Sequence, residues 1–373
     1  MIATITEKNM KEGPGTVRAT VTIATTFASP ALNRLRSVGG AAIVLLALSG
    51  LLAACRSQPA RTRSQVAQAK HAELIATAIQ VDGRQRSFTY YVPSNPAQRP
   101  PVILAFHGSG GSGARLRGFM GGELERLAEQ RGFIAVYPEG FEGNWNGCRA
   151  PAPSSANRLG IDDAGFVHAM LAWLTRELGA DPSRVYAIGF SGGGHMAYRL
   201  ALEIPEEIPA IAAIAASLPV EEELDCQLSG RPVSVMIVNG TADPVNPYGG
   251  GEVVAPGGTR LGHVRSTRAT AEYFAALAGL RQAPSALTLA PREAGGTGVD
   301  RATWAGGSGL EVRLYTIRGG GHTIPGPRSQ LPDFVGLTER RFSAIREALM
   351  FLLGPRWRPP LADAATAGSR GER

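Results

Sequence analysis

A serine, an aspartate and a histidine, each in or beside a glycine-containing turn, are the side chains of this sequence that could carry out chemistry together. Ser191 lies in Gly189-Phe190-Ser191-Gly192-Gly193, which matches the G-x-S-x-G nucleophile elbow between a strand and a helix. A serine hydroxyl is a good nucleophile only when a base takes its proton and a buried acid orients that base. Because 47 of the 373 residues are glycine, the motif can arise by chance, and the other groups must be found as well.

Asp243 is the predicted acid. It stands in the turn Gly240-Thr241-Ala242-Asp243-Pro244, directly after the apolar run Val233–Val238, although an aspartate in such a turn is also common for structural reasons alone. Enzymes with this elbow carry their groups in the chain order serine, acid, histidine. That order disfavours Asp162 and Asp163, while Asp225 and the Glu221–Glu223 cluster precede the buried run in a charged stretch.

His322 is the predicted base. It follows a strand candidate, Glu311–Ile317, and three glycines, a setting that suits an imidazole on a loop reaching back to the serine. His263 also follows Asp243 in the chain, but no strand precedes it. His195 lies one helical turn after Ser191, and we expect it to pack or cap rather than react.

The glycine-rich loop His107–Gly113 is the predicted oxyanion hole, because backbone N–H groups in such a turn can stabilise a developing negative charge. One donor should be the amide of Gly192, and the other the amide of Ser109 or Gly110. A phosphate-binding loop would end in G-K-[S/T], which is absent here. Because no cysteine or histidine spacing indicates zinc, we expect no metal and no cofactor.

Alternating strand and helix patterns predict an α/β fold with a mainly parallel, twisted sheet and helices on both faces. Active sites of such sheets lie at the carboxyl ends of the strands. The expected strands are Phe88–Val92, Val102–Phe106, Phe133–Tyr137, Val185–Ile188, Ile208–Ala216, Val233–Val238 and Glu311–Ile317. The expected helices are Leu116–Gln130, Asp162–Leu178, Gly192–Glu203, Thr267–Leu280 and Leu337–Leu353.

The N-terminal region is typical of an export signal, because Arg34 and Arg36 precede an uncharged run that ends Leu52-Ala53-Ala54-Cys55. This ending resembles the lipobox of bacterial lipoproteins, in which Cys55 would be acylated; simple secretion and an uncleaved anchor are the alternatives. We therefore predict a signal segment at 1–54, a polar tether at 55–74, a catalytic domain at 75–354 and a polar tail at 355–373.

The distribution of charge and the number of cysteines further restrict the functions and the compartment expected for the protein. The net charge of +7 lies in the flanks, since residues 71–354 alone carry a net charge of −2, and this disfavours nucleic-acid binding. With Cys55 assigned to lipid, Cys148 and Cys226 remain as an even pair in an oxidising compartment, so we predict a disulfide between them. The membrane would be reached through the lipid anchor only.

Six motifs in this order resemble the extracellular polyhydroxybutyrate depolymerase and feruloyl esterase group of α/β-hydrolases. They extend over nearly the whole body of about residues 75–353. They read H-G-S-G-G from 107, N-W-N-G-C from 144, G-I-D-D-A-G-F from 160, G-F-S-G-G-G from 189, G-T-A-D-P-V-N-P-Y-G-G-G from 240 and G-G-G-H-T-I-P-G from 319. The resemblance implies that Ser191, Asp243 and His322 are a triad that hydrolyses a carboxylic ester, in a small molecule or a polymer, through an acyl-enzyme.

Two residues bear on the substrate pocket. Trp145 is a candidate for the substrate cleft, or it packs its own loop. Ile324 stands where the family often has tryptophan, so the resemblance implies a pocket that lacks this aromatic wall. A serine peptidase or acyltransferase on the same fold and a non-catalytic envelope lipoprotein are the alternative functions, and the oligomeric state is left open.

Overall fold

The computed structural model describes residues 73–354. The predicted signal segment 1–54, Cys55 with most of the tether, and the tail 355–373 lie outside the described residues. The first strand begins at Leu74, beside the predicted start of the catalytic domain at residue 75.

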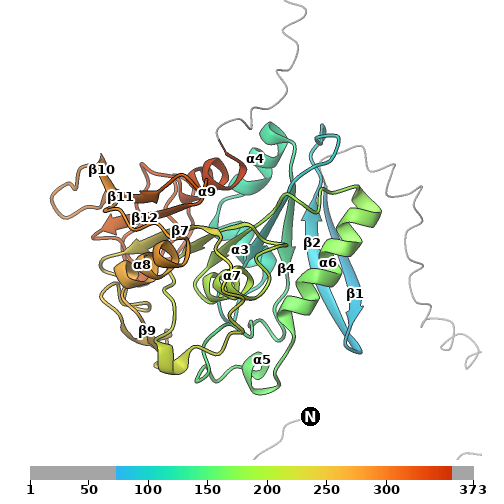
Figure 1. The fold of residues 1–373 in the computed structure, drawn as a ribbon, viewed down its shortest axis with the longest axis horizontal. Helices are drawn as coiled ribbons and strands as arrows, with labels where there is room; N and C mark the ends of the chain where they lie inside the picture. The colour runs from blue at the N-terminus through green and yellow to red at the C-terminus, as the bar shows by residue number, and fades with distance from the viewer. Residues whose placement is uncertain (1–72, 355–373) are drawn as a thin grey trace, which may run out of the picture. The chain divides into compact units, whose positions relative to one another are not determined.

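The centre of the structure is a ten-stranded sheet in the order β1-β2-β4-β3-β5-β6-β7-β12-β11-β10, and β8 with β9 forms a separate hairpin (Figure 1). Strands from β4 to β12 in this order pair in parallel, whereas the pairs at both edges are antiparallel. The strands are β1 Leu74–Val81, β2 Arg84–Tyr91, β3 Val102–Phe106, β4 Ile134–Pro138, β5 Val185–Phe190, β6 Ala210–Ile214, β7 Ser234–Gly240, β8 Gly251–Val254, β9 Arg260–Val264, β10 Ser285–Ala290, β11 Gly298–Ala305 and β12 Glu311–Arg318.

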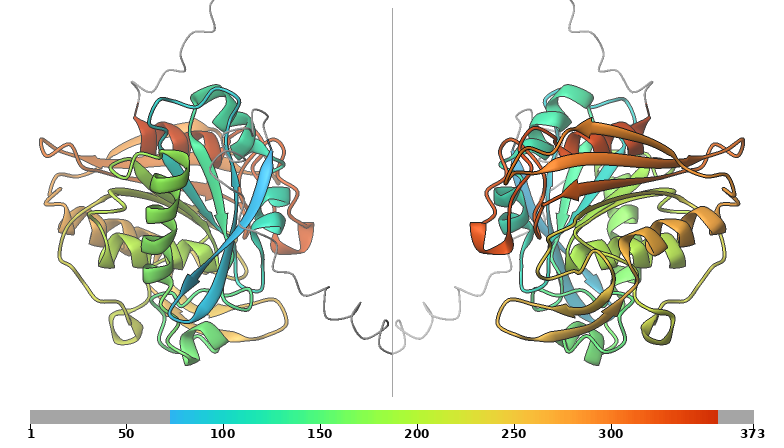
Figure 2. Two further views of the ribbon diagram at one scale, coloured as in Figure 1. Left: turned by 90° about the vertical axis from the view of Figure 1, so that its right-hand side faces the viewer. Right: turned by 90° about the vertical axis from the view of Figure 1, so that its left-hand side faces the viewer.

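Helices cover both faces of the sheet, as predicted: α6, α7 and α8 pack on one face, and α3, α4 and α9 on the other (Figure 2). The helices are α3 Gly113–Phe119, α4 Glu123–Arg131, α5 Ser155–Arg158, α6 Asp163–Leu178, α7 Gly192–Glu203, α8 Thr267–Leu277 and α9 Ala344–Leu353, with short 3₁₀ turns at Glu221–Glu223 and Asp333–Val335.

The central strands are buried on both faces, which explains why they read as continuous apolar runs. In β3, Val102, Leu104 and Phe106 enter one core cluster, whereas Ile103 and Ala105 enter the other. This alternation follows from the pleat of a strand, which turns successive side chains to opposite faces. The sheet is therefore fixed between two apolar layers, and the loops at its carboxyl edge have a rigid base.

Several expected elements differ from the structure. The helix expected at Leu116–Gln130 is two helices, because Gly121 and Gly122 have φ angles of 60° and 64°, outside the helical region. The last helix begins at Ala344 rather than Leu337, and Ser343 caps it by accepting a hydrogen bond from the amide of Arg346. The antiparallel strands β1 and β8–β11 were not predicted at all.

Candidate active site

Ser191 lies at a sharp turn between β5 and the start of α7. Its φ of 54° and ψ of −119° are strained for a residue other than glycine, at a cost of about 1–3 kcal/mol. The neighbouring glycines are required by space: a Cβ on Gly189 would overlap the carbonyl oxygen of Gly193, and a Cβ on Gly193 would overlap that of Phe106. The amide of Ser191 donates to Ile214 O at 2.8 Å, which ties the turn to β6.

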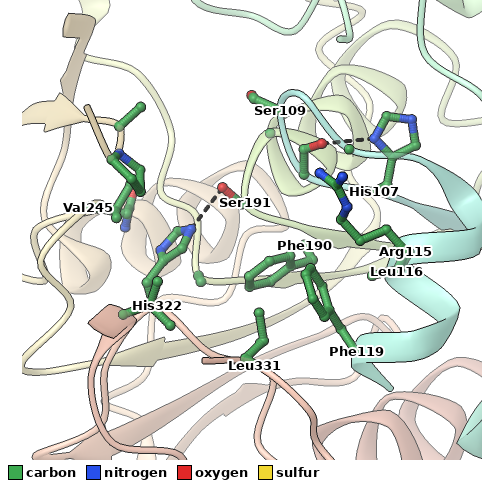
Figure 3. A pocket seen from close by; sticks show the side chains of 18 of the residues that line it. His107, Ser109, Arg115, Leu116, Phe119, Phe190, Ser191, Val245, His322 and Leu331 are labelled. Carbon is green, nitrogen blue, oxygen red and sulfur yellow. Dashed lines mark hydrogen bonds between the residues drawn. The ribbon is translucent and has the colours of Figure 1, made fainter. Parts of the chain in front are cut away.

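His322 stands between Ser191 and Asp243. Its Nε2 lies 2.9 Å from Ser191 Oγ (Figure 3). Its Nδ1 lies 2.8 Å from Asp243 Oδ2. The other carboxylate oxygen, Oδ1, accepts hydrogen bonds from the amides of Val245 at 2.7 Å and Asn246 at 2.8 Å. The carboxylate is completely buried, so the structure brings together the three residues predicted from the sequence in one hydrogen-bonded chain.

The loops after β7 and β12 hold the acid and the histidine against each other. A Cβ on Gly240 would overlap the carbonyl oxygen of Gly320, so the two loops approach more closely than side chains would allow. The amide of His322 donates to Val335 O at 2.7 Å, which fixes the histidine loop on its other side. The glycines before His322 therefore allow close packing of two loops rather than freedom of motion.

The loop after β3 faces the first residue of α7. A Cβ on Gly192 would lie 2.9 Å from the backbone nitrogen of Ser109, so the two backbones are in contact. The amide of Gly110 instead donates to Asn144 Oδ1 at 3.2 Å. Of the two candidates for the second oxyanion donor, Ser109 is thus the one placed beside Gly192, and Gly110 has a structural partner.

The side chain of His107 connects this loop to the loop that follows β4. Its Nδ1 donates to Gly108 O at 2.8 Å, and its Nε2 accepts from the amide of Gly140 at 3.0 Å, an arrangement that requires the neutral ring. Burial lowers the pKa of His107, which agrees with that neutral form. The indole nitrogen of Trp145 donates to His107 O at 2.9 Å.

A buried ion pair supports the segment that carries Asn144 and Trp145. Arg86 Nη2 lies 2.6 Å from Asp163 Oδ1, and both side chains are almost fully buried. Asp163 Oδ2 accepts from the amide of Asn146 at 2.7 Å. Burial raises the pKa of Asp163, and the nearby positive charge of Arg86 opposes the shift. The aspartate disfavoured as a catalytic acid is therefore a structural group.

A cavity of about 220 Å³ opens beside Ser191 and His322 (Figure 3). Ser109 and Gly192 line it, whereas Gly110, Trp145 and Ile324 are not among its lining residues. Its remaining wall is mostly apolar and is formed by Leu116, Phe119, Phe190, Val245, Val253, Leu261, Leu331, Phe334 and Val335. The two predicted pocket residues thus lie elsewhere: Trp145 packs edge-on against Phe106, and Ile324 is buried in the core.

Arg149 and His195 are polar residues of the cavity that were not predicted as functional. Arg149 and His195 line it and are 5% and 3% exposed. Arg149 follows Cys148, which the structure joins to Cys226 in the predicted disulfide. The spacing of His195 from Ser191 was the signal that could have found it, because residues four apart lie on one helix face.

A metal site and a membrane-spanning helix each place requirements on the described residues. Between residues 73 and 354, no three His, Cys, Asp or Glu side chains come together as metal ligands. No helix within the same range is long and apolar enough to cross a membrane.

A parallel sheet with a serine at its elbow, and with an aspartate and a histidine after later strands, defines an α/β-hydrolase. No protein-family model matches the chain. The chain is 34% identical over 289 residues to "Putative esterase NocK" of Nocardia uniformis subsp. tsuyamanensis. The alignment covers 75% of this chain and 82% of that protein. The chain therefore belongs to the esterases of the α/β-hydrolase fold, enzymes that hydrolyse carboxylic esters.

Shorter similarities include other esterases. Feruloyl esterase B of Neurospora crassa is 38% identical over 130 residues, which is 34% of this chain and 42% of that protein. Acetylxylan esterase A of Aspergillus oryzae is 32% identical over 127 residues, 34% of this chain and 40% of that protein. These alignments span less than half of either relative. Among solved structures, the acetyl xylan esterase from Aspergillus awamori has a TM-score of 0.47 at 20% identity, over 67% of this chain and 95% of that one.

Proposed function

We propose that the protein is a serine esterase that works through an acyl-enzyme, with Ser191 as nucleophile, His322 as base and Asp243 as the orienting acid. The observation that carries the proposal is the continuous hydrogen-bonded chain from Ser191 Oγ through His322 to the buried Asp243 carboxylate. In this arrangement the histidine Nε2 accepts the serine proton, while Nδ1–H donates to Asp243.

The proposed reaction has two steps. Ser191 Oγ attacks the ester carbonyl carbon, and the oxygen that becomes negative is received by the amides of Ser109 and Gly192. The proton held on His322 passes to the leaving alcohol, which leaves an acyl group on the serine. A water molecule, deprotonated by the same imidazole, attacks that acyl group and releases the acid.

The cavity supports a small buried group on the substrate. Its volume of about 220 Å³ is below the range of roughly 300–1,000 Å³ typical of sites that enclose drug-sized ligands. A cavity of this size has room for the acyl part of an ester, from acetyl or a short hydroxyalkanoyl group up to a feruloyl group. We therefore propose a polyhydroxybutyrate depolymerase-like or a feruloyl esterase-like activity, and a substrate panel distinguishes the two.

A substrate panel tests both the mechanism and the preference. Wild type, Ser191→Ala and Ser112→Ala should each be assayed on p-nitrophenyl esters of increasing chain length, hydroxybutyrate oligomers and methyl ferulate. Ser112 is a serine of the same cavity whose hydroxyl caps α3, so its variant should keep the activity that Ser191→Ala loses. Activity on p-nitrophenyl butyrate that survives Ser191→Ala would refute the mechanism. A preference for methyl ferulate would assign the feruloyl esterase-like activity, and a preference for short p-nitrophenyl esters or hydroxybutyrate oligomers would assign the other.

The non-catalytic alternative has a direct test. A fluorophosphonate probe reacts with an activated serine, so it should label the wild-type protein and not Ser191→Ala. Unlabelled wild type would favour an envelope protein that keeps the fold without the activity.

We also propose that the protein is exported and carries lipid on Cys55, with a short tether before the catalytic domain. The Leu52-Ala53-Ala54-Cys55 sequence supports this, as does the Cys148–Cys226 disulfide, because disulfides persist in oxidising compartments. Metabolic labelling with a palmitate analogue should mark the wild-type protein, and Cys55→Ser should lose the label. Labelling that persists in Cys55→Ser would contradict the assignment.

A further inference from the structure

The cavity beside Ser191 contains an arginine that is buried without a hydrogen-bond partner for one of its terminal nitrogens. Arg149 lines the cavity, is 5% exposed, and finds no acceptor for Nη1 within residues 73–354. Burying a guanidinium with an unused donor is costly, so such groups in proteins are normally paired. An acceptor supplied by a bound substrate would remove that cost.

The nearest acid does not fill this role. Glu223 lies close enough for its charge to favour the protonated form of Arg149, against burial, which lowers the pKa of the arginine to about 10. Both Glu223 oxygens, however, bond to His263: Oε2 accepts from its amide at 2.5 Å, and Oε1 lies 2.7 Å from Nδ1. Arg149 therefore stays charged at neutral pH, and its Nη1 has no acceptor among the described residues.

The backbone around Arg149 is fixed in advance of binding. The preceding residue, Cys148, is bonded to Cys226, and Arg149 itself forms an antiparallel bridge with Leu224. The carbonyl oxygen of Arg149 accepts from Asn157 Nδ2 at 3.1 Å. The backbone that carries the guanidinium therefore need not be ordered when a ligand binds, which lowers the entropic cost of recognition.

His195 adds a second unpartnered polar atom close to the nucleophile. It lies four residues after Ser191 on α7, a spacing that brings side chains to about 5–6 Å at Cβ. Its Nδ1 is buried without a partner among the described residues. Burial lowers the pKa of His195, and the neighbouring Arg149 and His322 lower it further. The ring is therefore neutral and can donate one hydrogen bond.

We propose that Arg149, with His195, binds a carboxylate carried by the ester substrate within a few bonds of the scissile carbonyl. This inference rests on the proposed esterase function and names its substrate class: esters that bear a free acid group. A guanidinium pairs with carboxylate and phosphate alike. The carboxylate fits better here because a single charge from Arg149, near Glu223, matches a monoanion rather than a dianion.

Two matched substrate pairs test the proposal and locate the acid group. On the acyl side, monomethyl succinate is compared with methyl succinamate, which has the same shape but no charge. On the alcohol side, acetoxyacetate is compared with acetoxyacetamide. The ratio of kcat/KM within a pair, measured by pH-stat, isolates recognition of the charge from general effects on folding or chemistry.

Wild type should prefer the charged member of one pair by about 10- to 100-fold, the range expected for hydrogen bonds to a charged group. Arg149→Gln should bring that ratio close to one, and Arg149→Lys should keep part of it. Arg115→Gln is the matched control, because Arg115 lines the same cavity but is exposed and already donates to Gly110 O at 3.1 Å. Its variant should keep the ratio.

Each outcome decides the question. No preference for the charged ester in either pair overturns the proposal, and so does a preference that disappears in Arg115→Gln but persists in Arg149→Gln. An acetoxyacetate preference places the acid on the alcohol, and a monomethyl succinate preference places it on the acyl group. Hydrolysis of neutral esters that survives Ser191→Ala would instead refute the esterase mechanism itself.

Discussion

Removing the Cys148–Cys226 disulfide should destabilise the catalytic domain strongly. The two cysteines are 78 residues apart in sequence, and their Cα atoms are 5.0 Å apart. For a loop of this length, the chain-entropy relation gives about 4.5 kcal/mol at 25 °C. Because each kcal/mol shifts Tm by roughly 2–4 °C in domains of this size, Tm should fall by about 9–18 °C.

The crosslink and the packing of its sulfur atoms can be separated by comparing single variants. Cys148 is fully buried, whereas Cys226 is only partly buried, so Cys226→Ala removes the crosslink with little loss of core packing. Thermal unfolding of Cys226→Ala, Cys148→Ala and the double variant, followed by circular dichroism, should show similar decreases in Tm. A decrease below about 3 °C for Cys226→Ala would refute the entropic argument.

Three further predictions concern the support of the site. Asn144→Ala removes the acceptor for the amide of Gly110 and should lower kcat about 3- to 10-fold with little change in KM, measured on p-nitrophenyl butyrate. Arg86→Met leaves the carboxylate of Asp163 buried and unpaired, and urea unfolding should show a loss of about 3–5 kcal/mol, partly restored by adding Asp163→Leu. Burial depresses the pKa of His107 and His195, so the unfolded chain binds more protons than the folded protein below pH 6.5. The free energy of unfolding should therefore fall by up to about 2 kcal/mol per histidine from pH 7 to pH 5. Urea unfolding of His107→Asn should show a smaller fall over the same pH range.

The sequence predicts the sheet centre well because the central strands are buried on both faces. The short length of an apolar run such as Val102–Phe106, and the glycine-rich loop that follows it, favour a buried strand over a buried helix. The antiparallel edges lack this signal: β10 is exposed along most of its length, and its side chains Leu287 and Leu289 point to solvent. Edge strands of this kind depend on pairing with β11, which no local pattern records.

The residues of the candidate site also differ in how far the sequence predicts them. Ser191, Asp243 and His322 are recognisable because each follows a strand, and strand ends meet at one edge of the sheet. Arg149 lies in an irregular stretch without periodicity, and its place depends on contacts with Cys226 and Leu224, more than 70 residues away. Local sequence patterns cannot reveal a position that is set by long-range contacts.

Ile324, which stands where the family that the sequence resembles often has tryptophan, lies in the core rather than at the cavity. Its side chain is 1% exposed within the core and does not line the cavity, so replacing the family's tryptophan there changes packing rather than the described cavity wall. The wall beside His322 comes instead from Leu331 and Val335, on the segment whose Val335 carbonyl accepts the His322 amide. The same segment therefore lines the cavity and holds the histidine loop, and a substitution that widens the cavity there should also disturb His322.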